Sequence, residues 1–215
     1  MTNSYDISKE LDGIIEDLRR HFDAVDRERE EIYAHARELR RLSTRSIREV
    51  HKGFPQNAEC ALSDLRELAA KITATFRRYP FVEEALQEYS EASLFLAFLK
   101  GQKIPAAGEI NTTERAYLLG LADCVGELRR HVLLLISRDR LDEAARFVDL
   151  MEEIFYLLMK FDHPDGVIPI RHKQDQLRPI VERTRAEFTM IQCQKRLENK
   201  LTGHDLTAGS EGILR

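Results

Sequence analysis

The stretch FVEEALQEYSEASLFLAFLK, residues 81–100, decides the fold because it is apolar on nearly every side of the helix that it predicts. One side carries Phe81, Phe95 and Phe98. The opposite side carries Leu86, Tyr89, Ala92, Leu96 and Leu99. A helix of this kind is buried inside a protein. Glu88 and Glu91 lie three residues apart on it, so their carboxylates share one face. Buried carboxylates are costly unless a cation meets them.

A second acidic pair, Asp123 and Glu127, lies four residues apart in a later helical stretch. Ala116 and Gly120 precede it on the same stripe and are small enough to let another helix approach closely. Four facing acids would form a site for hard divalent cations, which activate water and neutralise charge on a phosphodiester. His131, one turn further on, is either a contributor to that site or a packed side chain. The alternative for each acidic pair is a solvated face, because 37 residues of the chain are acidic.

The first 50 residues predict one very long helix, from Ser8 to about Lys52, because this segment contains no proline. Apolar residues recur in it at seven-residue intervals: Leu11, Leu18, Val25, Ile32 and Leu39. Such a repeat is typical of helices that pack on other helices. The helix is longer than is usual in globular proteins, so we expect part of it to pack on another subunit or to be broken.

The second half of this helix carries four arginines at helical spacing, Arg37, Arg41, Arg45 and Arg48, which we call the basic ridge. Arg40, His51 and Lys52 lie beside it. The ridge is either a surface for phosphate groups or a solvated face that pairs with Glu38 and Glu49.

The rest of the chain also predicts helices, and no β-branched alternation indicates a strand. We expect helices over about 57–79, 81–100 and 114–138, a fifth capped by Asp139, and a last one from Gln174 or Leu177 to Leu201 with Pro179 in its first turn. The predicted fold is an all-α, single-domain antiparallel bundle of six to seven helices over residues 1–201. A flexible tail over residues 202–215 follows.

Composition indicates a soluble protein. The 215 residues are 43% hydrophobic and 33% charged, with a formal charge of −4. The three cysteines, Cys60, Cys124 and Cys193, lack the spacing of a zinc site or a disulfide framework, which fits a reducing cytoplasm. We expect a cytoplasmic protein with no membrane partner, because neither a membrane-spanning segment nor a signal peptide is evident.

Two motifs, LQEYSEA at residues 86–92 and YLLGLADCVGEL at residues 117–128, resemble the translin superfamily. Within it they are most similar to the translin-associated factor X (TRAX) branch, in a compact prokaryotic form of archaeal type. The resemblance implies a magnesium-dependent endoribonuclease, with manganese as a substitute, whose metal-binding catalytic acids are Glu88, Glu91, Asp123 and Glu127. It also implies a homo-oligomer, a closed octamer-like shell with its basic helices and catalytic sites facing inward.

The function that we expect is therefore metal-dependent cleavage of single-stranded RNA at the four acids, with the basic ridge positioning the backbone. One alternative is a non-catalytic, translin-like oligomer that binds RNA or single-stranded DNA and whose acids pair with arginines. Another is an all-α nucleoside triphosphate pyrophosphohydrolase, since those enzymes also use Glu-x-x-Glu followed by a second acidic pair.

Overall fold

The computed structural model describes residues 4–75 and 78–208, and these residues form helices and connecting loops with no strand. The prediction of an all-α fold with a very long first helix is confirmed. The elements are α1 (Ser4–His51), α2 (Pro55–Thr75), the 3₁₀ helix η1 (Pro80–Val82), α3 (Glu83–Lys100), the 3₁₀ helix η2 (Ala107–Ile110), α4 (Glu114–Ile136), α5 (Leu141–Leu158) and α6 (Ile170–Ala208). Among the described residues, no helix is both long enough and apolar enough to cross a membrane. The chain divides into two compact units, residues 1–117 and 118–215.

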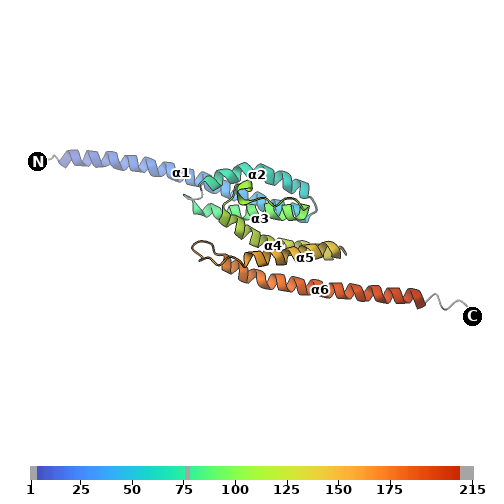
Figure 1. The fold of residues 1–215 in the computed structure, drawn as a ribbon. Helices are drawn as coiled ribbons and strands as arrows, with labels where there is room; N and C mark the ends of the chain where they lie inside the picture. The colour runs from blue at the N-terminus through green and yellow to red at the C-terminus, as the bar shows by residue number, and fades with distance from the viewer. Residues whose placement is uncertain (1–3, 76–77, 209–215) are drawn as a thin grey trace, which may run out of the picture. The chain divides into compact units, whose positions relative to one another are not determined.

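In the first unit, α1, α2 and α3 lie side by side (Figure 1). Helix α3 supplies much of the core, because half of its residues are buried and Leu86, Tyr89 and Phe95 are almost completely enclosed. The expected burial of the stretch 81–100 is confirmed for most of its apolar residues, beginning with Val82, whereas Phe81 is exposed. The other half of α3 is partly or fully open to solvent, and Glu88 lies on this side.

Helix α1 has two halves in different surroundings. Ile32, Leu39 and Ile47 in its second half are buried, where α1 packs on α2 and α3. Every side chain from Ile7 to Ala24 is exposed, and Figure 1 shows this part of α1 extending beyond α2 and α3. The seven-residue repeat is therefore covered in one half of the helix and open in the other.

In the second unit, polar contacts join α4, α5 and α6. The Arg129 guanidinium of α4 lies 2.9 Å from the Glu187 carboxylate of α6. Arg185 of α6 donates hydrogen bonds of 2.7 and 2.5 Å to the Glu152 carboxylate of α5. Apolar side chains such as Met151 close the core between these contacts.

Helix α6 begins at Ile170, earlier than predicted, and it continues through Pro179 rather than starting just before it. Proline inside a helix removes one hydrogen bond and costs about 3 kcal/mol. Tertiary contacts offset this cost: the buried Gln174 amide donates to the carbonyl oxygens of Leu158 and Phe161, at 2.9 and 2.8 Å. The position of Pro179 therefore does not predict where this helix begins, although proline is usually confined to the first turn of a helix.

Two other boundaries differ from the prediction. Asp139 does not cap α5, because its φ of 56° places it in a left-handed turn and its carboxylate accepts a hydrogen bond from Lys195 at 3.0 Å. Helix α6 reaches Ala208, so residues 202–208 of the predicted tail are helical, and residues 209–215 lie outside the described residues.

The open half of α1 carries an apolar stripe of Ile7, Leu11, Ile15, Leu18 and Phe22, each about half exposed or more. A stripe of this kind is stabilised by packing on another helix. We predict that replacing Leu18 and Phe22 together by serine lowers the mass measured by light scattering, because the lost surface belongs to a contact between copies. The control replaces Lys9 and Glu16 by serine on the opposite face and keeps the wild-type mass. A double apolar variant of wild-type mass would contradict this role of the stripe.

Candidate functional site

Glu88 is held by two residues of α1. Its Oε1 lies 2.6 Å from Nε of Arg40, and its Oε2 accepts a hydrogen bond of 2.9 Å from the Thr44 hydroxyl. The same arginine is 3.3 Å from a carboxylate oxygen of Glu84. The Glu88 side chain is 24% exposed, so its charge is only partly hydrated. A cation and a hydroxyl group thus replace part of the lost water, as a half-buried carboxylate requires.

The four residues of the basic ridge, Arg37, Arg41, Arg45 and Arg48, are all exposed and line one groove of about 840 Å³ along α1. Arg40 and Thr44 line the same groove. Arg41 also pairs with Glu38 at 3.2 Å, one of the pairs that the solvated-face interpretation expects. The groove and the Glu88 carboxylate therefore share two side chains.

Glu91 follows Glu88 by one turn of α3 and is likewise half-buried. In the second unit, Asp123 and Glu127 are one turn apart on α4, with 28% and 24% of their side chains exposed. The Lys173 ammonium group of α6 contacts the Asp123 carboxylate. Arg130 of α4 lies 3.9 Å from a carboxylate oxygen of Glu127. Each unit thus contains one acidic pair, as the helical spacing predicts, with basic side chains beside it.

His131, which the sequence leaves as a contributor to the site or a packed side chain, lies edge-on to the Phe147 ring. The ring centroids are 4.8 Å apart and the interplanar angle is 86°. This geometry is that of a favourable aromatic contact within the second unit.

The chemistry of the four acids fits a hard cation, because carboxylate oxygens are the ligands that Mg²⁺ prefers and the basic partners mark positions where positive charge is favourable. Among residues 4–75 and 78–208, no group of three or more His, Cys, Asp or Glu side chains is close enough to hold a metal ion. The combination of Glu88, Glu91, Asp123 and Glu127 into one metal site stays a prediction.

Sequence reasoning missed two of the partners, Thr44 and Lys173. They lie 44 and 50 residues from the acids that they contact. Neither residue belongs to a periodic pattern or motif that includes its partner. Arg40 was visible beside the ridge, but nothing in the sequence links it to Glu88.

The fold is that of an all-α protein with a very long first helix and a basic groove along it. The chain belongs to the translin family, whose model matches residues 14–185. It is 36% identical over 177 residues to the uncharacterized protein MJ0175 of the archaeon Methanocaldococcus jannaschii, and the match covers 80% of each chain. The chain is thus of the compact, archaeal translin-like type.

Solved structures agree with this assignment. AfC3PO, whose structures include a complex with duplex RNA, is 32% identical, with a TM-score of 0.75 over 84% of this chain and 97% of the other. Apo-NeC3PO is 20% identical, with a TM-score of 0.73 over 82% of this chain and 96% of the other, and it shares the fold.

The contact between Arg40 and Glu88 can be measured by a double-mutant cycle with Arg40→Gln and Glu88→Gln. We predict a coupling free energy of about 0.5–1 kcal/mol in urea unfolding, because one partner is exposed and solvent weakens the pair. The control cycle combines Glu88→Gln with Arg45→Gln, since Arg45 lies in the same groove. It should give a coupling near zero. Equal coupling in the two cycles would mean that the Arg40 contact is not specific.

Proposed function

We propose that this chain is a magnesium-dependent endoribonuclease that binds RNA along the basic ridge and cleaves it at Glu88, Glu91, Asp123 and Glu127. The observation that carries the proposal is the sharing of Arg40 and Thr44 between the groove and Glu88. A phosphate backbone in the groove would then lie beside an acidic side chain. The related AfC3PO has been solved with duplex RNA, which supports RNA as the ligand class.

The basic ridge would bind the RNA backbone through phosphate contacts. Its arginines present exposed guanidinium groups, which pair with phosphate oxygens and release bound counterions. Such contacts do not read the base sequence. Arg40 adds a link to the acids, because it lies on Glu88 and can also donate to a phosphate in the groove, while Thr44 keeps the Glu88 carboxylate oriented.

The four acids would hold Mg²⁺, or Mn²⁺ in its place. When bound, such an ion supplies an activated water and neutralises the charge that develops on the phosphodiester. The chain itself places each carboxylate pair on one face of a helix. The side chains of Glu127 and Asp123 are only 24% and 28% exposed, so they are partly shielded from water. Partial burial strengthens the interaction of these carboxylates with any cation.

The proposed assembly is a homo-oligomer in which the apolar stripe of α1 packs on a second copy. The closed octamer-like shell and the preference for single-stranded RNA or DNA rest on the resemblance to the TRAX branch. An enclosed site would admit a flexible single strand more easily than a duplex, so comparing the cleavage of single-stranded and duplex RNA tests this part of the proposal.

The first prediction from this function concerns the acids. Glu91→Gln or Asp123→Asn should lower magnesium-dependent cleavage of a labelled RNA by on the order of 100-fold or more, because each removes a charged metal ligand. RNA binding, measured by fluorescence anisotropy, should stay within about twofold, since the ridge is unchanged. Glu153→Gln, at an exposed acid of α5, is the control and keeps wild-type activity. A folded Asp123→Asn variant that cleaves at the wild-type rate would rule out this site.

The second prediction concerns the ridge. Changing Arg37, Arg41, Arg45 and Arg48 to glutamine should weaken binding similarly for all RNA sequences. It should also reduce the slope of log affinity against log salt by about 3, because each phosphate contact on a single strand contributes about 0.7. The control changes Arg19, Arg20, Arg27 and Arg29 to glutamine. These residues are exposed on the same helix outside the groove, so the control variant loses the same charge. Equal losses in both variants would show that only net charge matters.

A second candidate function is RNA binding without catalysis. It is favoured by the ion pairs of Glu88 with Arg40 and of Asp123 with Lys173, since paired acids have a structural role of their own. A magnesium titration with labelled RNA separates the two functions, with nucleoside triphosphates included as the alternative substrate. Binding without cleavage at any magnesium or manganese concentration would favour this candidate.

A further inference from the structure

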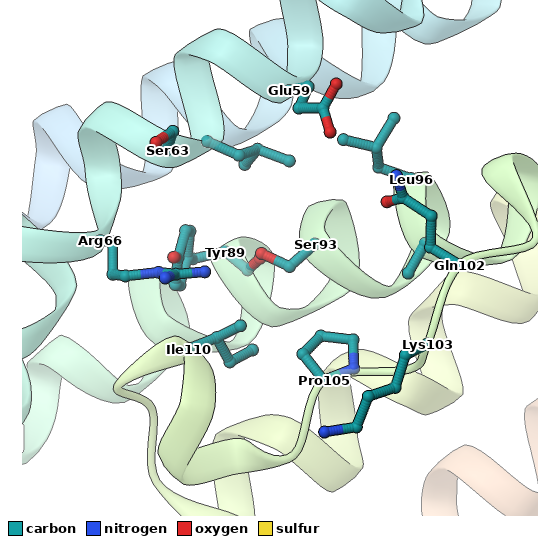
Figure 2. Close-up of a pocket in the computed structure, with 12 residues that line it drawn as sticks. Glu59, Ser63, Arg66, Tyr89, Ser93, Leu96, Gln102, Lys103, Pro105 and Ile110 are labelled. Atoms are coloured by element: carbon teal, nitrogen blue, oxygen red, sulfur yellow. The ribbon is translucent and has the colours of Figure 1, made fainter.

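A second hollow of the first unit lies away from the groove and the acids. It is a pocket of about 320 Å³ lined by α2, α3, the loop after α3 and Ile110 of η2 (Figure 2). Its lining is mixed: the buried side chains of Leu62, Leu96 and Ile110 form part of the wall, and polar or charged side chains form the rest. Its volume lies at the lower end of the range of small-molecule sites.

Each of the two acids near this pocket already has a lysine partner. The Glu59 carboxylate accepts a hydrogen bond from Lys100 at 2.5 Å, which lowers its pKa, with a smaller contribution from Gln102. The Glu109 carboxylate accepts hydrogen bonds of 2.7 Å from Lys103 and from the Ala106 N–H. Each acid thus has a lysine as its main partner, and Arg66 makes only the smallest of the contributions that lower the pKa of Glu109.

The remaining cation of the pocket is Arg66, which forms no ion pair within the part of the chain that the structure describes. Its guanidinium is close enough to Tyr89 to influence the pKa of that hydroxyl, as Ser93 also does. Tyr89 is only 1% exposed, and burial raises the pKa of its hydroxyl, so the phenol stays neutral. Figure 2 shows Arg66 extending from α2 toward Tyr89 and Ser93. Arg66 is exposed, so its guanidinium is open to an anion that enters the pocket.

The polar groups of the pocket have a definite spacing. Ser63 lies three residues before Arg66 on α2, so both face the same side and the hydroxyl can donate to an anion on Arg66. Glu59 lies seven residues before Arg66, which is about 10 Å along the helix axis. Its carboxylate, with Gln102 beside it, offers hydrogen bonds at the far end. A matching ligand has an anion at one end, a polar edge at the other and apolar faces between them.

We propose that this pocket binds a nucleoside monophosphate, with the phosphate on Arg66 and Ser63 and the edge of the base toward Glu59 and Gln102. The base would lie against the apolar part of the wall, Leu62, Leu96 and Ile110, and the phosphate would form an ion pair with the guanidinium of Arg66. This site is separate from the ridge and the acids, and it does not depend on the proposed ribonuclease activity.

The test is calorimetric titration of the magnesium-free protein with AMP, beside ribose 5-phosphate, inorganic phosphate and citrate. Wild-type protein should bind AMP in a saturable way, and Arg66→Gln should weaken binding about tenfold or more, because a charge-assisted hydrogen bond is lost. Ser63→Trp, at an exposed position, should block the pocket by volume without removing a core contact. Arg196→Gln, at an exposed arginine of α6, is the control and should bind as wild type.

The ridge variant with four glutamines should also bind AMP as wild type, which distinguishes this site from the RNA groove. The proposal is overturned if wild-type protein shows no saturation up to about 10 mM AMP, a concentration that would detect even very weak binding. It is also overturned if folded Arg66→Gln and Ser63→Trp variants both bind AMP normally. Equal affinity for AMP and for inorganic phosphate or citrate would refute recognition of the nucleotide.

Discussion

The burial of α3 is the constraint on which the first unit depends. With half of its residues enclosed, the rotation of this helix about its axis is fixed, because any other rotation would expose Leu86 or Phe95. Glu88 is therefore directed toward α1, where it must find partners. Arg40 and Thr44 meet it there, and the same two side chains belong to the groove of basic residues. The apolar core thus determines where the acid and the basic groove come together.

The ion pairs of the site orient the Glu88 and Asp123 carboxylates, and they contribute little to the stability of the fold. About half of the Arg40 side chain is exposed, and a pair of this kind contributes about 0–1 kcal/mol. Burial of one large apolar side chain contributes about 1.5–3 kcal/mol. The fold therefore does not depend on Arg40 or on Lys173 of the second unit. These residues fix the orientation of Glu88 and Asp123, which a metal or phosphate ligand would require.

Local signals and tertiary contacts disagree at two places in the chain. Pro179 predicts a helix start, yet α6 passes through it because the contacts of Gln174 with Leu158 and Phe161 hold the preceding turns. The apolar repeat of α1 is uniform from Leu11 to Leu39, yet only its second half is covered within the chain. In both cases the local pattern correctly predicts a helix. The neighbouring helices decide where that helix begins and which part of it is buried.

The sequence by itself determined the all-α fold, the order of its helices, the burial of most apolar residues of α3 and the spacing of the acid pairs on α3 and α4. These properties depend on spacing along one helix, where side chains three or four residues apart share a face. Only the tertiary structure decided that Glu88 meets Thr44, that Asp123 meets Lys173, and that Arg66 faces a pocket with Tyr89 at its wall. The reason is geometric: periodicity tells which residues share a face, but the packing of the helices tells what covers that face.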